Sequence, residues 1–225
     1  GRLFGDRLST ERFQLGITAD VTFTNATGIE GASARTSWLF GAYGQVRLSE
    51  TWSLVPGLTI KTPAGMSGFQ PGEAGNQFEE TGIPEVDELF EAGTVRRAAN
   101  YLTVPVELRY QAGRMGISGG GYFGDMTGGS DRLETDAEQG FLTLEDDKIP
   151  DHLNRWDGGL RATLDFMLKP ERQMRSMRLH VTGSYGLVDV LKDNPGDPLR
   201  NWGVFAGFQI PVGVRDAAEE AAEGN

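Results

Sequence analysis

The sequence contains no cysteine and only two histidines, and none of its apolar runs approaches the roughly 18 residues that a membrane-spanning helix needs. Without cysteine, disulfide bonds and thiolate metal sites are excluded. Basic residues are outnumbered, with 21 Lys and Arg against 32 Asp and Glu and a net charge of -11. Because phosphate binding needs clustered positive charge, nucleic acid is not an expected partner. Residues 1–4 lack a basic start followed by an apolar stretch, so we expect any export signal to have been removed from this numbering.

What the sequence has instead is an alternation of apolar and polar residues that recurs along the whole chain, which is the period of a β-strand with two unlike faces. From Phe13 to Phe23, the odd positions are apolar and the even positions are glycine or polar. Segments with this pattern cover residues 13–23, 37–48, 52–61, 102–110, 115–123, 156–166, 177–187 and 201–212. The chain is therefore predicted to be all-β, with eight antiparallel strands.

The connections between these segments alternate in length. Residues 49–50 and 111–114 read as tight turns, and the link at 169–176 is moderately short. The long links are at residues 24–35, 63–98, 125–153 and 189–200. Short turns on one side and long loops on the other are typical of transmembrane barrels, whose short turns are periplasmic and whose long loops are extracellular. With an even number of strands, we expect both termini on the periplasmic side.

Eight alternating strands fit two opposite kinds of barrel. A soluble, lipocalin-like barrel that binds a ligand buries its apolar face, whereas a membrane barrel turns that face to lipid and fills its lumen with polar side chains. The aromatic residues of the apolar face favour the membrane, because they fall at strand ends, where an apolar body meets a polar boundary. The predicted aromatic girdles comprise Phe23, Trp38, Phe123, Trp156, Tyr185 and Trp202 at the loop end and Phe13, Trp52, Tyr110 and Phe166 at the turn end.

The polar face carries charges of both signs well inside the strands. The predicted lumen charge network comprises Asp20, Arg47, Lys61, Glu107, Arg109, Asp157, Arg161, Asp165 and Arg178. An eight-stranded lumen is just wide enough to be filled by side chains, and unpaired charges there would be costly, so we expect these residues to pair. We therefore predict an eight-stranded antiparallel up-and-down transmembrane β-barrel over residues 1–213, with the outer-membrane lipid bilayer as its partner, and an acidic periplasmic tail at 214–225.

Several segments resemble those of one family. The run Tyr101-Leu-Thr-Val-Pro-Val-Glu-Leu-Arg-Tyr110 is similar to the "Y-L-x-I-P-L-x-L-x-Y" strand of the outer membrane protein beta-barrel domain family, which includes PorT-like proteins of Bacteroidota. Residues 119–124, 157–160, 184–189 and 201–204 resemble later strands of that family, in the same order. The resemblance implies an eight-stranded outer-membrane barrel without a catalytic motif and, by analogy with PorT-like relatives, a secretion-accessory role. Many outer-membrane barrels end on an aromatic residue, whereas this chain continues past Val212 into its acidic tail.

The two histidines, His152 and His180, limit the catalytic options. His180 lies on a polar face with Thr182 and Ser184, which leaves open a lipid- or peptide-processing hydrolase. We favour a histidine that hydrogen-bonds in the lumen, because a catalytic triad is defined by geometry rather than by closeness in sequence. The chain is thus predicted not to be an enzyme and to need no cofactor. The acidic stretches at 131–138 and 145–147 lack the spacing of a calcium loop, so no metal site is predicted.

The two longest loops are the best candidates for binding, because loops of more than about 15 residues are usually functional or disordered. Their apolar residues would either pack over the barrel mouth or contact a partner: Phe69, Phe78, Leu89, Phe90, Phe141 and Leu142. The leading hypothesis is a non-enzymatic barrel that acts as an anchor or subunit and presents these loops to a protein partner or to identical copies. A passive pore is the third hypothesis, and it is disfavoured because Arg, Asp, Tyr122 and Phe205 side chains would block the lumen.

Overall fold

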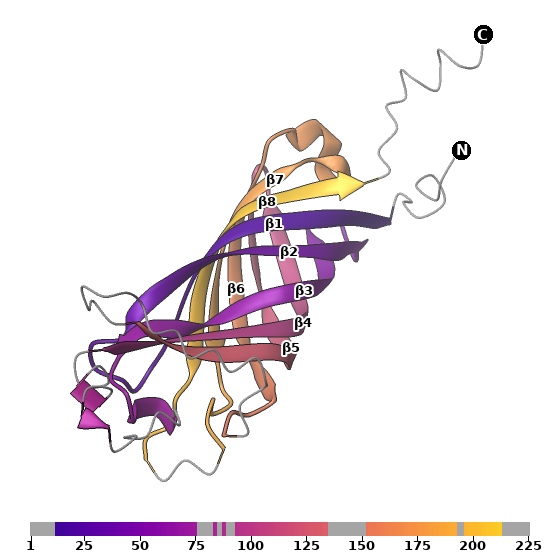
Figure 1. The fold of residues 1–225 in the computed structure, drawn as a ribbon. Coiled ribbons are helices and arrows are strands. Elements are labelled where there is room, and N and C mark those ends of the chain that lie inside the picture. Colours follow the sequence, from indigo (N-terminus) through magenta and orange to yellow (C-terminus); the bar gives the residue numbers. More distant parts are fainter. Residues whose placement is uncertain are drawn as a thin grey trace, which may run out of the picture.

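The computed structural model describes residues 12–75, 83–84, 87–88, 93–134, 152–192 and 196–212. Eight β-strands in this part of the chain follow one another around a closed antiparallel barrel, in which the last strand pairs with the first (Figure 1). The strands are β1 (Phe13–Ala26), β2 (Ser33–Arg47), β3 (Trp52–Phe69), β4 (Thr94–Ala112), β5 (Met115–Glu134), β6 (Trp156–Met167), β7 (Arg178–Gly186) and β8 (Asn201–Val212). The fold class predicted from the alternation is confirmed.

Short connections gather at one end of the barrel, the turn end, where β1 begins and β8 ends. This end carries the β2–β3 and β4–β5 turns and the 3-10 helix η2 (Pro170–Arg175), whereas the 3-10 helix η1 (Glu73–Gly75) lies at the opposite end, the loop end (Figure 1). In the β4–β5 turn, Gly113 has a φ of 59°, a conformation that a residue with a side chain rarely adopts. No helix in the described ranges is long and apolar enough to cross a membrane.

The apolar face of the barrel wall looks outward. Leu160 is 58% exposed, Val181 50% and Val204 37%, whereas Asp165, on the other face, is 2% exposed. A soluble barrel would bury these apolar side chains, since each square ångström of apolar surface left in water costs about 25 cal/mol. The soluble, lipocalin-like alternative is therefore wrong.

Aromatic side chains on the outer surface lie at two levels. At the turn end, Trp52 is in register with Tyr110, and their ring centroids are 5.0 Å apart. At the loop end, Phe123 stacks on Trp156 with ring centroids 5.1 Å apart. The strand β6, with 12 residues, runs from one level to the other, which is close to the length of about 9–11 residues that a tilted strand needs to cross a bilayer.

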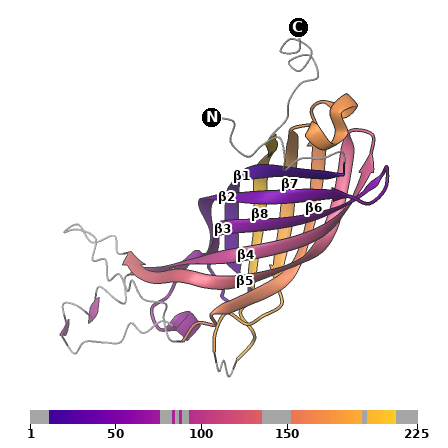
Figure 2. The same cartoon turned by 90° about the vertical axis from the view of Figure 1, so that its right-hand side faces the viewer.

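Three adjacent strands continue beyond the loop-end aromatic level. The strands β3, β4 and β5 have 18, 19 and 20 residues, and Figure 2 shows β5 projecting well past β6. Strand β5 pairs with β6 only as far as Asp125 but pairs with β4 as far as Glu134. At about 3.3 Å per residue, this difference adds roughly 30 Å of strand. We call residues 62–69, 94–101 and 126–134 the extension.

The extension corrects the predicted loops at residues 63–98 and 125–153, because both ends of the first and the start of the second are strand. These strand ends were predicted as loops because the inner face of β4 changes from polar to apolar along its length. Near the turn end the inner face carries Glu107 and Arg109, whereas in the extension it carries Val95 and Ala99. Outside lipid, water covers the outer surface, so the inward face becomes the apolar one.

An apolar core fills the space between the extension and the connections at the loop end. Its buried members are Ala26, Ala64, Met66, Phe69, Val95, Ala99, Tyr101, Met126, Leu133, Leu153, Val190 and Leu199. A bridge between Leu153 and Leu191 ties the segment before β6 to the segment after β7. The loop end of the barrel is therefore covered by a packed apolar cluster.

Candidate functional site

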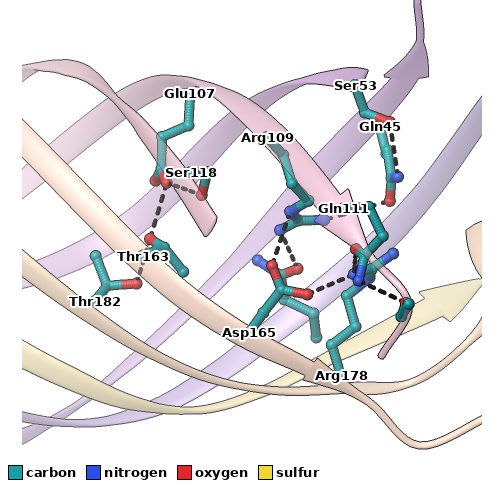
Figure 3. Close-up of polar contacts among 12 residues, drawn as sticks. Gln45, Ser53, Glu107, Arg109, Gln111, Ser118, Thr163, Asp165, Arg178 and Thr182 are labelled. Carbon is teal, nitrogen blue, oxygen red and sulfur yellow. Dashed lines mark hydrogen bonds and ion pairs between the residues drawn. The ribbon is translucent and has the colours of Figure 1, made fainter. Parts of the chain in front are cut away.

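Two arginines share one buried aspartate in the half of the lumen nearer the turn end (Figure 3). The Asp165 carboxylate, whose side chain is completely buried, lies 3.1 Å from Nε of Arg109 and accepts a hydrogen bond from Arg178. Each arginine also donates to an amide oxygen, Arg109 to Gln209 at 2.8 Å and Arg178 to Gln111 at 2.6 Å. The cluster joins residues from β4, β6, β7 and β8 across the barrel.

Glu107 is the centre of a second cluster (Figure 3). Its Oε2 accepts hydrogen bonds of 2.8 Å from the hydroxyls of Ser118 and Thr163, and its Oε1 lies 3.3 Å from Nε of Arg161. The guanidinium of Arg161 in turn lies 5.6 Å from the centre of the Phe205 ring. The carboxylate thus receives hydroxyl donors and an opposite charge from strands β5 and β6, as a buried anion requires.

His180 pairs with an acid rather than with a hydroxyl. Its Nε2 lies 2.8 Å from Oδ1 of Asp20, with both side chains at 5% exposure or less, and its Nδ1 has no hydrogen-bond partner among the residues that the structure describes. The hydroxyl of Thr18 donates to the same aspartate at 3.1 Å. The hydroxyl of Ser184 donates instead to the Gly203 carbonyl at 3.5 Å. Among the described residues, no hydroxyl side chain forms a hydrogen bond with the His180 ring, as the nucleophile of a hydrolase would.

Asp157 lies on the loop-end side of these clusters. Its Oδ2 accepts hydrogen bonds from the Tyr122 hydroxyl at 3.2 Å and from the Asn201 amide at 3.1 Å. Beside it is a cavity of about 30 Å³, whose lining includes Arg161 and Phe205. A space of this size holds about two water molecules, which makes it too small for a ligand.

A bidentate ion pair lies in the extension. Arg97 donates from Nε and Nη2 to the two carboxylate oxygens of Asp131 at 2.8 and 2.6 Å, and the two side chains are 2% and 9% exposed. The Nη1 of Arg97 donates to the Ala74 carbonyl at 2.9 Å, and its Nη2 lies 3.2 Å from Nε2 of His152. The guanidinium also lies 5.6 Å from the centre of the Phe69 ring. One side chain thus links β3, β4, β5, η1 and the segment before β6.

The structure places most of the predicted lumen charges inside the barrel. Those inside are Asp20, Glu107, Arg109, Asp157, Arg161, Asp165 and Arg178. Arg47 is half-buried at the turn end of β2, where it donates to the Ser49 carbonyl at 3.2 Å. The prediction for Lys61 was wrong, since this residue is exposed next to Ile60, which is 71% exposed. A register shift between Thr59 and Thr62 interrupts the alternation there, as a β-bulge does.

The predicted girdle residues differ in exposure, and most of the predicted loop residues are not described by the structure. Exposed girdle residues are Phe23, Trp38, Trp52, Tyr110, Phe123, Trp156 and Tyr185, and the half-buried ones are Phe13, Phe166 and Trp202. Phe69 is not a loop residue but the last residue of β3, and it is fully buried in the apolar core. Of the two alternatives for this residue, it therefore packs at the barrel mouth and is not available as a partner contact. Outside the described residues lie Phe78, Leu89, Phe90, Phe141, Leu142 and the tail at 214–225.

Sequence reasoning missed Arg97 and Asp131. The signal that could have found Arg97 is the alternation of β4, which continues back from Thr103 through Tyr101 to Val95 without a break. Asp131 belongs to an acidic stretch considered for calcium, yet its carboxylate is occupied by Arg97. No group of three or more potential metal ligands occurs among the described residues.

Comparison with known proteins gives one family match and several similar structures. A family model described as "Outer membrane protein beta-barrel domain" matches residues 8–192. The attachment invasion locus protein Ail of Yersinia pestis, solved with the heparin analogue sucrose octasulfate, is 10% identical with a TM-score of 0.41, covering 88% of this chain and 97% of Ail. Neisserial surface protein A is 8% identical with a TM-score of 0.42, covering 87% and 96%. OprG of Pseudomonas aeruginosa is 8% identical with a TM-score of 0.34, covering 88% and 94%. None of the curated proteins compared with the sequence matches it.

Proposed function

The chain belongs to the outer membrane protein beta-barrel domain family, and from this premise we propose that it is a non-enzymatic barrel that presents its extension to a protein partner or to a second copy of itself. In this proposal the extension lies outside the cell, and the turn end, with both termini, lies in the periplasm. The barrel anchors the extension in the bacterial outer membrane. A secretion-accessory role would be one use of such an anchor.

The observation that carries the proposal is the edge of β5. Beyond Asp125, β5 keeps β4 on one side, but no described strand pairs with residues 127–134 on the other side, because β6 begins at Trp156. The run Thr-Gly-Gly-Ser-Asp-Arg-Leu-Glu has no proline or lysine to discourage pairing. Proteins usually protect open edges, and an extended segment of a partner binds to such an edge through main-chain hydrogen bonds.

The packing of the extension supports the same role. Phe69, Val95 and Leu133 have no exposed surface, and the Arg97–Asp131 pair crosslinks β4 to β5 beneath them. A surface that is already ordered loses less conformational entropy when a partner binds. The extension is therefore suited to recognition.

The interior argues against the other two hypotheses. The partner of His180 is Asp20, and both are buried, so within the described part of the chain no hydroxyl stands beside the histidine to act as a nucleophile. A pore would need continuous space, whereas charged clusters fill the lumen and the cavity beside Asp157 is about 30 Å³. We infer that the lumen has a structural role.

The test is site-specific photo-crosslinking of the full chain in intact outer membranes. A photoreactive residue at Thr127, which is exposed at the β5 edge, should give one adduct of defined mass, either with a partner or with a second copy. The matched control is Thr51, an exposed threonine of the β2–β3 turn. Absence of an adduct at Thr127, or equal adducts at both positions, would contradict the proposal.

A further inference from the structure

Most of the acidic side chains buried in the described part of the chain have a basic partner. The pairs are Asp20 with His180, Glu107 with Arg161, Asp131 with Arg97, and Asp165 with Arg109 and Arg178. Asp157 is the exception, because it is 6% exposed and no basic side chain of the described residues forms an ion pair with it. The charge of this one buried carboxylate is therefore not balanced by the protein.

The groups that donate to Asp157 are all electrically neutral. The Tyr122 hydroxyl and the Asn201 amide donate to its Oδ2, and the Gly158 backbone N–H also faces the carboxylate. Its Oδ1 is buried and forms no hydrogen bond of normal geometry with any described residue. Burial of a charge without an opposite charge is costly, so this site should take up either a proton or a cation.

A second unsatisfied oxygen borders the same cavity. Thr62 of β3 lines the cavity together with Asp157, and its buried Oγ1 has no hydrogen-bond partner in the described ranges. The register shift between Thr59 and Thr62 explains this placement, since a β-bulge changes the direction of the side chains that follow it. Two oxygens without donors, one of them charged, suit a metal cation better than a neutral guest, because hard cations bind to oxygen ligands.

The size and the charge of the site select among cations. The cavity of about 30 Å³ excludes an organic molecule but has room for one metal ion and one water molecule. Calcium takes about 6–8 oxygen ligands, several of them usually carboxylates, whereas this lining contains one carboxylate. Arg161, the other charged residue of the lining, is already 3.3 Å from Glu107. One negative charge thus remains, which a singly charged cation balances.

We propose that Asp157 and Thr62 bind a monovalent metal cation, Na⁺ or K⁺, in the cavity at the loop end of the lumen. Asp157 supplies the charged ligand Oδ1, Thr62 supplies the neutral ligand Oγ1, and water completes the coordination. The ion joins β3 to β6, which are not neighbours in the barrel. It lies next to the apolar core, since Ala64 and Tyr101 belong both to the core and to the cavity lining. The inference does not depend on the proposed partner of the extension.

The test is the stability of the full chain in zwitterionic lipid vesicles, measured as the urea midpoint in NaCl, KCl or choline chloride at equal ionic strength. Choline is too large for the cavity, so it supplies ionic strength without filling the site. The wild-type midpoint should be higher in NaCl or KCl, and the salt with the larger shift identifies the ion. Above its dissociation constant, each tenfold rise in that cation should stabilise the protein by about 1.4 kcal/mol. Equal midpoints in the three salts would mean that Asp157 takes up a proton, which would overturn the proposal.

Asp157→Asn should abolish the difference between the salts, because the amide keeps the shape of the side chain and removes its charge. The matched control is Asp125→Asn, at the same end of the barrel, where Asp125 lies 2.6 Å from the exposed Arg155. This control should keep the full salt difference. A difference that persists in Asp157→Asn, or that is lost equally in both variants, would overturn the proposal.

Thr62→Val keeps the proposal falsifiable if Asp157→Asn does not fold. In choline chloride this variant should be at least as stable as the wild-type protein, because it removes a buried hydroxyl that has no hydrogen-bond partner in the described ranges. In NaCl or KCl it should need an about tenfold higher cation concentration for half of the stabilisation, because the ion loses a ligand. An unchanged cation dependence in Thr62→Val would count against the site.

Discussion

Arg97 of β4 and Asp131 of β5 face each other in register and join through two hydrogen bonds of 2.8 and 2.6 Å, sealed from solvent beyond the loop-end aromatic level. The pair lies under the ring of Phe69 and reaches the Ala74 carbonyl. A buried ion pair contributes little over an apolar pair, but removal of one partner leaves an uncompensated buried charge. The extension should therefore depend strongly on this pair.

Asp131→Asn should loosen the extension while the barrel stays closed. The substitution keeps the shape of the side chain but leaves the Arg97 cation buried against a neutral amide, at a cost of about 3–5 kcal/mol. Hydrogen exchange should then show faster exchange in residues 94–101 and 126–134 and unchanged protection in β6 and β8.

The control for this experiment is Glu134→Gln on the same strand. Glu134 lies 3.5 Å from Arg96, and both side chains are 39% exposed, so its loss should cost less than about 1 kcal/mol. Equal effects of the two substitutions would show that burial of the Arg97–Asp131 pair does not stabilise the extension.

Asp165→Asn should destabilise the whole barrel. Asp165 is the acid that Arg109 and Arg178 share, and the substitution leaves two buried cations without a counterion. We expect a loss of about 3–5 kcal/mol, with a lower urea midpoint for unfolding from lipid vesicles, followed by tryptophan fluorescence. Lys61→Gln is the informative control, because Lys61 is exposed at a bulge and its loss should leave the midpoint unchanged. A large effect of Lys61→Gln would place that side chain in the lumen after all.

The strands within the membrane wall could be predicted from the sequence, because lipid outside and a polar lumen inside impose a strict period of two. The predicted segments at 156–166 and 201–212 differ from β6 and β8 by one residue at most. The far ends of β3, β4 and β5 could not be predicted in the same way. Beyond the bilayer the apolar face turns inward, and the run Thr127-Gly-Gly-Ser130 has the composition of a turn.

The pairing of the lumen charges could not be predicted from the sequence. Alternation places Arg109, Asp165 and Arg178 on polar faces, but their contact across the barrel depends on how far each strand is shifted against its neighbour when the sheet closes. At Lys61 even the predicted face was wrong, because a bulge adds one residue and reverses the faces that simple alternation predicts. Faces are therefore easier to predict than contacts.

His180→Ala should change stability and not catalysis. The purified wild-type protein should hydrolyse neither short-chain esters nor acylated lipids, because the neighbour of His180 is Asp20 and the hydroxyl of Ser184 donates to a backbone carbonyl. The variant should unfold at a lower urea concentration, since Asp20 loses its partner. Measurable hydrolysis by the wild-type protein that disappears in both His180→Ala and Ser184→Ala would establish the enzyme instead.

Planar bilayers that contain the protein should show no steady single-channel steps. The Arg109–Asp165–Arg178 cluster and the contact between Arg161 and Phe205 lie across the lumen at different heights. A double variant R161A/F205A should remain closed, because the Asp165 cluster still blocks the path. Clear steps in the wild-type protein would contradict this account of the interior.

Proline substitutions at the two glycines of the β5 edge should separate partner binding from folding. Neighbouring N–H groups of a strand point to opposite edges, so one of Gly128→Pro and Gly129→Pro removes a donor from the free edge and the other removes a donor to β4. The free-edge variant should lose the photo-crosslink at Thr127, because the proline ring also blocks an incoming strand, while the exchange protection of residues 94–101 is kept. The other variant should lose that protection. A crosslink of wild-type yield in the variant that keeps its protection would mean that the partner contacts the extension by some route other than strand pairing.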